Sequence, residues 1–77
     1  MSQDLSISKI VLFHRKKAGL SREALADLAG IGRSTIYDLE KGKMSVRYSN
    51  LLKICEVLNI HMVFHSPLMG EIQNEES

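Results

Sequence analysis

Four hydrogen-bonding side chains, Arg33, Ser34, Thr35 and Asp38, are clustered near the middle of this 77-residue sequence. The guanidinium group of an arginine can donate two parallel hydrogen bonds to O6 and N7 of guanine, and a hydroxyl group can bond base edges or phosphate. The methyl group of Thr35 can contact thymine, and Asp38 can either accept from N4 of cytosine or orient Arg33. The cluster therefore predicts contacts to the base edges of duplex DNA.

A second set of side chains on both sides of this cluster is suited to phosphate. Lys, Arg, Ser and Tyr side chains donate hydrogen bonds to phosphate oxygens, which sets affinity and register without reading the base sequence. Tyr37 is long enough to reach the sugar-phosphate wall, although it could instead pack on the protein surface. The residues predicted to contact phosphate are Ser21, Arg22, Tyr37, Lys41, Lys43 and Arg47.

The base-reading cluster needs a rigid element that presents its side chains together. Ile36 and Leu39 are the apolar residues of the stretch RSTIYDLE, and their spacing predicts a helix over residues 33–40 that ends at Gly42. A helix of eight residues is about 12 Å long, which allows it to lie in the major groove with its first turn against base edges.

Two further helices are predicted before this one, over the stretches SKIVLFHRKKAGL and LSREALADLAG. In the second of them, Ser21 is a good N-cap and Gly30 is a good C-terminal stop. Only the residues GIG separate it from the helix over 33–40, and so short a turn makes the two helices cross steeply. The apolar stripe predicted for the second helix consists of Leu25, Leu28 and Ala29.

A fourth helix is predicted over residues 48–58, followed by a short strand. The core residues predicted on this helix are Leu51, Leu52, Ile54, Cys55 and Leu58. The next stretch, IHMVFH, alternates in the manner of a strand, with Ile60, Met62 and Phe64 on one face. We expect residues 1–66 to form one domain and residues 67–77 to be a flexible acidic tail.

Composition places the chain among ordinary globular proteins, with 44% hydrophobic and 25% charged residues. A domain this small buries only about 60% of its extended surface, so a dimer interface would add stability. The charges are uneven, because residues 1–69 carry ten cations and six anions, a net charge of +4, and the last eight residues carry three glutamates. A mildly basic body is compatible with a nucleic acid partner.

Membrane association and catalysis are not expected. The apolar runs are far shorter than the roughly 18 residues of a membrane span, and the N-terminus lacks the pattern of a secretory signal. The single cysteine, Cys55, rules out an internal disulfide and fits a reducing, cytoplasmic compartment. We find no glycine-rich phosphate loop, metal-ligand cluster or pair of carboxylates in an apolar setting. The sequence therefore predicts neither an enzyme nor a cofactor or metal site.

The twenty residues from Arg22 to Lys41 resemble the Cro/cI-type (Xre) helix-turn-helix family. Ala26 is small where the two helices approach closely, Gly30 lies in the turn, and the apolar positions have the required spacing: Leu25, Ala29, Ile31, Ile36 and Leu39. The stretches RKKAGLS, LEKGK and LLKICEVLNI extend the match to residues 7–60. Within the family, the sequence is most similar to HipB-like antitoxins, in which a short strand follows the last helix.

The resemblance implies an all-α fold: a compact domain of four to five helices, with a short C-terminal strand that pairs across a homodimer. A lone strand has no partner within an otherwise helical chain, and a second copy would satisfy its backbone groups. The residues expected at the dimer interface are Ile60, Met62, Val63 and Phe64. In the resembling family, the arginine and glutamate at the positions of Arg15 and Glu40 form an internal ion pair.

The function implied is that of a sequence-specific repressor that binds an inverted-repeat operator in double-stranded DNA as a homodimer. The HipB-like branch further implies an antitoxin that represses its own operon and sequesters a HipA-like serine/threonine kinase toxin. Two alternatives remain open. The chain could be a stand-alone phage-type or restriction-control regulator without a toxin, or its helix-turn-helix could serve mainly for protein interaction. The operator sequence and the toxin cannot be deduced from these residues.

Overall fold

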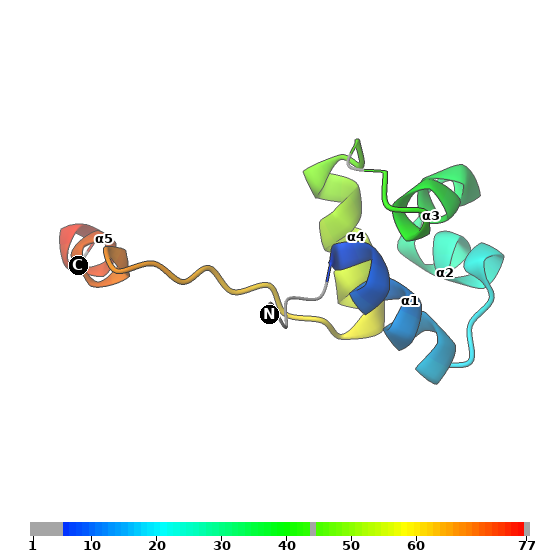
Figure 1. The fold of residues 1–77 in the computed structure, drawn as a ribbon, viewed down its shortest axis with the longest axis horizontal. Helices are drawn as coiled ribbons and strands as arrows, with labels where there is room; N and C mark the ends of the chain where they lie inside the picture. Colours follow the sequence, from blue (N-terminus) through cyan, green and yellow to red (C-terminus); the bar gives the residue numbers. More distant parts are fainter. Residues whose placement is uncertain (1–5, 44, 77) are drawn as a thin grey trace.

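The structure, a computed structural model, describes residues 6–43 and 45–76. Figure 1 shows that four helices pack together and that a fifth lies apart, at the end of an extended segment. The helices are α1 Ile7–Lys17, α2 Arg22–Ala29, α3 Arg33–Glu40, α4 Tyr48–Leu58 and α5 Met69–Glu76. No helix in the described residues is both long and apolar enough to cross a membrane.

The ends of α2 are set by the two residues that the sequence indicated. Ser21 is extended, and its Oγ accepts a hydrogen bond from the backbone N–H of Ala24 at 3.0 Å, which caps the helix. Gly30 ends α2 with φ at +71°, a left-handed conformation that favours glycine. The predicted α2–α3 turn is thus confirmed. Helix α3 follows Gly32 without a side-chain cap.

The core lies where the four packed helices meet. Helix α2 packs against α3 and α4, and α1 packs against the same two helices. The largest of the completely buried side chains among the described residues are Val11, Leu25, Ile36 and Ile54. Ala26 is 1% exposed, in agreement with the small residue expected where α2 approaches its neighbours.

Two of the predicted core residues are wrong. Leu28 is 62% exposed and Leu52 is 43% exposed, although both have helical spacing to buried leucines. Each lies on a side of its helix that the other packed helices do not cover. Leu28 contributes instead to the rim of a surface hollow between α2 and α4, together with Ala29, Lys53 and Val57.

The predicted C-terminal strand is not formed in this chain. Residues 60–66 are extended, but no strand is present among the described residues. A strand needs a neighbouring strand to bond its backbone groups, and the described residues supply none. Ile60 and Met62 pack against the core, whereas Val63 and Phe64 are each 68% exposed.

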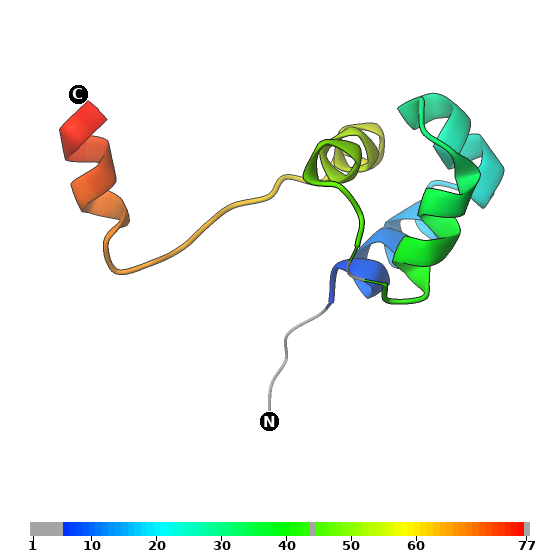
Figure 2. The ribbon, with the colours of Figure 1, turned by 90° about the horizontal axis from the view of Figure 1, so that it is seen from above.

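The segment expected to be an acidic tail contains a helix. Residues 69–76, predicted to be a flexible tail, form the helix α5 in the structure. Figures 1 and 2 show α5 well separated from the four packed helices in both views. This helix begins after a turn in which the Oγ of Ser66 accepts a hydrogen bond from the N–H of Leu68 at 3.2 Å.

Candidate nucleic-acid interface

Helix α3 has one buried side and one polar side. Ile36 and Leu39 are only 0% and 3% exposed and anchor the helix to the core. Arg33 and Ser34, in the first turn, are exposed, and Thr35 is half-buried beside them. Because the buried side fixes the rotation of α3 about its axis, these three polar side chains lie together at the N-terminal end of the helix.

Arg33 forms an ion pair that the sequence did not indicate. Its Nη1 donates to Oε2 of Glu23, which lies in the first turn of α2. Both side chains are largely exposed, so the pair contributes little to stability. It does orient the guanidinium, whose other N–H groups can still serve as donors.

Asp38 contacts Lys43 rather than Arg33. The Nζ of Lys43 lies 3.5 Å from Oδ1 of Asp38, and both groups are about half exposed. The carboxylate therefore lies beside a cation from the loop that follows α3. Of its two predicted roles, orienting Arg33 is not seen in the structure.

A hollow of about 200 Å³ lies between α3 and the start of α4. It is lined by Thr35, Asp38, Ser45, Val46, Arg47 and Asn50. Predicted base-reading and phosphate-contacting residues therefore share one concave surface. Ser45 and Asn50 were missed, because polar residues of a loop and of a following helix have no sequence spacing that relates them to α3.

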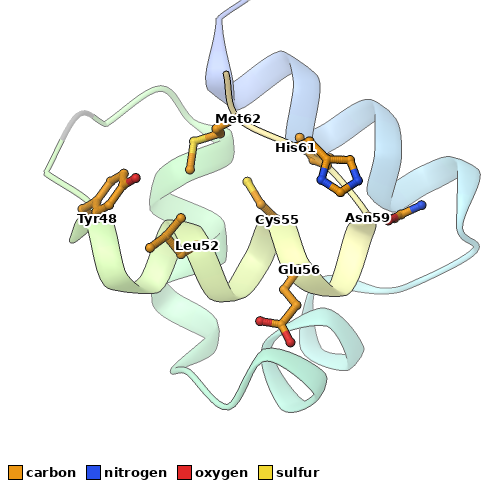
Figure 3. Close-up of a pocket in the computed structure, with 8 residues that line it drawn as sticks. Tyr48, Leu52, Cys55, Glu56, Asn59, His61 and Met62 are labelled. Carbon is orange, nitrogen blue, oxygen red and sulfur yellow. The ribbon is translucent and has the colours of Figure 1, made fainter. Parts of the chain in front are cut away.

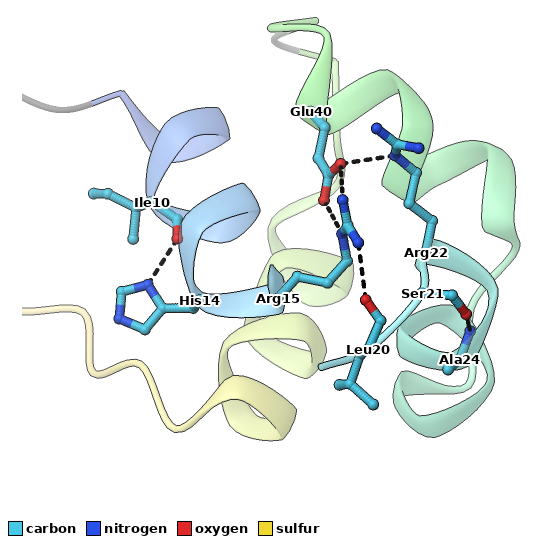
Figure 4. A network of polar contacts seen from close by, with 8 residues as sticks. All are labelled: Ile10, His14, Arg15, Leu20, Ser21, Arg22, Ala24 and Glu40. Atoms are coloured by element: carbon cyan, nitrogen blue, oxygen red, sulfur yellow. Dashed lines mark hydrogen bonds and ion pairs between the residues drawn. The ribbon is translucent and has the colours of Figure 1, made fainter. Parts of the chain in front are cut away.

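A buried carboxylate fixes α3 against α1 and α2. Figure 4 shows Glu40 between two arginines. Arg15 donates from Nε to Oε2 at 2.6 Å and from Nη2 to Oε1 at 3.1 Å, and Arg22 donates from Nε to Oε1 at 2.8 Å. Arg15 also donates from Nη1 to the carbonyl of Leu20 at 2.8 Å. One carboxylate at the end of α3 thus connects all three helices.

The network holds Glu40 ionised. Burial raises the pKa of Glu40, but the hydrogen bonds from Arg15 and Arg22 outweigh burial and leave this pKa below its ordinary value. The same carboxylate raises the pKa of Arg22. Breaking one partner of such a buried pair leaves a charge without compensation.

Arg22 has a structural contact in addition to its predicted role at phosphate. Its Nε is bonded to Glu40, and its guanidinium carbon lies 4.9 Å from the centroid of the Tyr37 ring. The side chain is still 40% exposed. Arg22 and Tyr37 therefore form one stacked unit at the surface of α2 and α3, held from beneath by Glu40.

The remaining predicted phosphate contacts surround α3. Ser21 is exposed, although its hydroxyl group caps α2. Lys41 and Arg47 are exposed on either side of the loop between α3 and α4. The described residues contain no group of three or more His, Cys, Asp or Glu side chains placed to hold a metal ion.

Comparison with known families identifies the fold and the class of protein. A Helix-turn-helix family model matches residues 14–64, which is more than half of the chain. The chain therefore belongs to the helix-turn-helix family, of Cro/cI type. Over 32 residues it is 53% identical to an uncharacterized HTH-type transcriptional regulator of Methanothermobacter thermautotrophicus. The matched region spans 42% of this chain and 46% of that regulator, so it is less than half of either protein.

Solved structures with this fold include complexes of HipB. A HipA-HipB-O2-O3 complex contains a chain that matches with a TM-score of 0.72 and 20% identity, over 87% of this chain and 99% of that one. A HipB-O4 20mer complex matches with a TM-score of 0.71 at the same identity and coverage. A structure described as MDT Protein gives a TM-score of 0.72, also at 20% identity. The similarity to HipB inferred from the sequence is confirmed at the level of the fold.

Proposed function

We propose that this protein is a sequence-specific DNA-binding repressor that acts as a homodimer on an inverted repeat. The polar N-terminal turn of α3 is the observation that carries this proposal. Arg33 and Ser34 are exposed at that turn, while Ile36, Leu39 and the Glu40 network hold the opposite side of the helix. A helix held in this way can enter the major groove without rearrangement, so little conformational entropy is lost on binding.

The surroundings of α3 support the same role. Lys41, Lys43 and Arg47 are exposed in and beside the loop that follows α3, and the stacked pair of Arg22 and Tyr37 lies at the surface of α2 and α3. Cations beside a reading helix are placed to bond the phosphate backbone that borders a major groove. The basic residues would set affinity, while the first turn of α3 would select the sequence.

Dimerisation is the second part of the proposal. Val63 and Phe64 are each 68% exposed, and with α1 and α4 their segment surrounds an apolar hollow of about 280 Å³. A second copy would cover these side chains and bond the extended backbone of residues 60–66. Two copies of α3 would then read half-sites about 34 Å apart.

Selection of bound sequences from random duplexes tests the proposal directly. The expected result is an inverted repeat, enriched in moderate salt by the wild-type protein, and the same repeat with a relaxed preference at one position for Arg33→Ala. Lys53→Ala is a matched control, because Lys53 is an exposed cation on α4 that lies outside the surface around α3. Absence of any enriched sequence with the wild-type protein would refute a role in specific recognition.

A second candidate function is that of an antitoxin that also binds a HipA-like kinase. The match to a chain of a HipA-HipB-O2-O3 complex favours it over a stand-alone phage-type or restriction-control regulator. A surface for a protein partner is available along α4, where a hollow of about 350 Å³ is bordered by residues that include Tyr48, Leu52 and Met62 (Figure 3). The same surface would serve a helix-turn-helix used mainly for protein interaction.

Co-purification separates these functions. A kinase encoded beside this gene should be retained by the tagged wild-type protein and lost with Leu52→Asp, while binding to DNA is unchanged. Retention by both proteins would place the contact elsewhere. Failure of the wild-type protein to retain the kinase would favour a stand-alone regulator.

A further inference from the structure

Helix α5 and the turn before it carry aliphatic side chains that the described residues of this chain leave exposed. Leu68, in the turn that leads into α5, is 60% exposed, and Ile72 is 48% exposed. The N–H of Ile72 donates to the carbonyl of Leu68 at 3.4 Å, so the two side chains lie on the same side as residues four apart in a helix do. Glu71 and Glu75 are exposed next to them, and the last turn of α5 contains no basic residue. The helix therefore presents aliphatic side chains bordered by carboxylates.

An apolar groove with a cation at its edge lies on the main body of the protein. It is about 510 Å³ in volume and lies between the start of α1, the end of α3 and the start of α4. Its apolar residues include Ile7, Leu39, Val46, Tyr48 and Leu51. Lys43 also lines it, with a side chain that is 62% exposed.

We propose that this groove binds α5 of a second copy of the chain, with the aliphatic side chains of α5 in the groove and its carboxylates near Lys43. Charge distinguishes this groove from two of the hollows that share lining residues with it. The hollow along α4 contains Glu56, which would repel α5, and the hollow beside residues 60–64 contains no Lys or Arg. The groove near Lys43 combines an apolar lining with a complementary charge.

The path of the chain favours a second copy over the same copy as the source of α5. Residues 60–66 run extended from the end of α4, and they carry α5 away from the packed helices of its own chain, as Figures 1 and 2 show. A segment that leaves one body in this way can reach a neighbouring copy without bending back. The groove also shares Ile7 with the hollow beside residues 60–64. A second copy bound at that hollow would therefore lie next to the groove.

Disulfide trapping between two differently tagged chains tests whether α5 of one copy binds the groove of the other. One chain carries Ser8→Cys at the groove and the other carries Ile72→Cys on α5, both in a Cys55→Ala background. A disulfide forms only when the two Cβ atoms approach to about 4 Å, so the rate of cross-linking reports this contact. Asn74→Cys is the control, because residue 74 lies on the opposite side of α5 from Ile72.

The expected result is a mixed disulfide that forms at least about tenfold faster with Ile72→Cys than with Asn74→Cys. Lys43→Glu should slow the formation of this mixed disulfide. Lys53→Glu, which changes a cation outside the groove, should leave its rate unchanged. Equal rates for the two α5 positions would overturn the proposal. So would a doubly substituted chain that forms its disulfide only within one molecule. Sedimentation of Ile72→Asp, in which the contact of α5 with a second copy should be lost, reports dimerisation through residues 60–64 separately, so the two proposals can fail independently.

Discussion

Arg15 of α1 and Glu40 of α3 form a bidentate ion pair, with 2.6 Å between Nε and Oε2 and 3.1 Å between Nη2 and Oε1. Their side chains are only 8% and 4% exposed. The carboxylate also accepts a hydrogen bond from Arg22 of α2, so the three helices meet at one charge. The orientation of α3, and with it the surface proposed to bind DNA, depends on this contact.

Removing the carboxylate should be strongly destabilising. We expect Glu40→Ala to lower the free energy of unfolding by about 3–5 kcal/mol, because it leaves the buried guanidinium of Arg15 without its partner. Urea titration followed by circular dichroism measures this change. Glu75→Ala, on the exposed surface of α5, is the control and should change stability by less than about 0.5 kcal/mol. A loss as small as the control would show that the network does not hold the helices together.

Stability should decrease in acid through the same carboxylate. The pKa of Glu40 is lower in the folded protein than its ordinary value of 4.5, so its contribution is complete above pH 4.5. That contribution is lost as the pH falls through the lower, folded-state pKa. Thermal unfolding between pH 7 and pH 2 should show a steeper acid loss in the wild-type protein than in Glu40→Gln. Parallel pH profiles would contradict the lowered pKa.

Arg33 should determine one base pair of the operator. We expect Arg33→Ala to weaken binding to the selected duplex by about 1–3 kcal/mol and to relax the preference at a single position. Mobility-shift titrations with every base pair substituted in turn measure both effects. An equal loss on all sequences, including unrelated DNA, would assign Arg33 to phosphate instead.

Lys43 should contribute to affinity without regard to sequence. Its change to alanine should weaken binding to all duplexes and reduce the slope of log affinity against log salt by about one. Fluorescence anisotropy over a range of salt concentrations gives that slope, with Lys53→Ala as the matched control. If the slope does not change, Lys43 makes no contact with phosphate.

Phe64 should be required for the proposed dimer. Because its ring is 68% exposed in the single chain, Phe64→Asp should leave the fold intact while placing a charge in an apolar interface. Sedimentation velocity at micromolar concentration should show a dimer for the wild-type protein and a monomer for the variant. Met62 is less suitable for this test, because it packs against the core of its own chain. A dimer that persists in Phe64→Asp would rule out this interface.

The sequence by itself determined the local elements. Ser21, Gly30 and the apolar spacing of Ile36 and Leu39 depend on contacts within a few residues, so they predicted the ends of α2 and the buried side of α3 correctly. The four packed helices and the helix-turn-helix class follow from these patterns, since each is set by periodicity and turn chemistry.

Relations between distant residues were decided by the tertiary structure alone. Which leucines are buried depends on whether another helix covers them, and for this reason Leu28 and Leu52 could not be distinguished from Leu25. The pairing of Arg33 with Glu23 joins positions ten residues apart, and Ser45 and Asn50 reach the surface near α3 only through the packing of α4. The stretch IHMVFH alternates as a strand does, yet residues 60–66 form no strand in the described chain. The alternation of side chains favours an extended backbone, but a hydrogen-bonded ladder also requires a second strand.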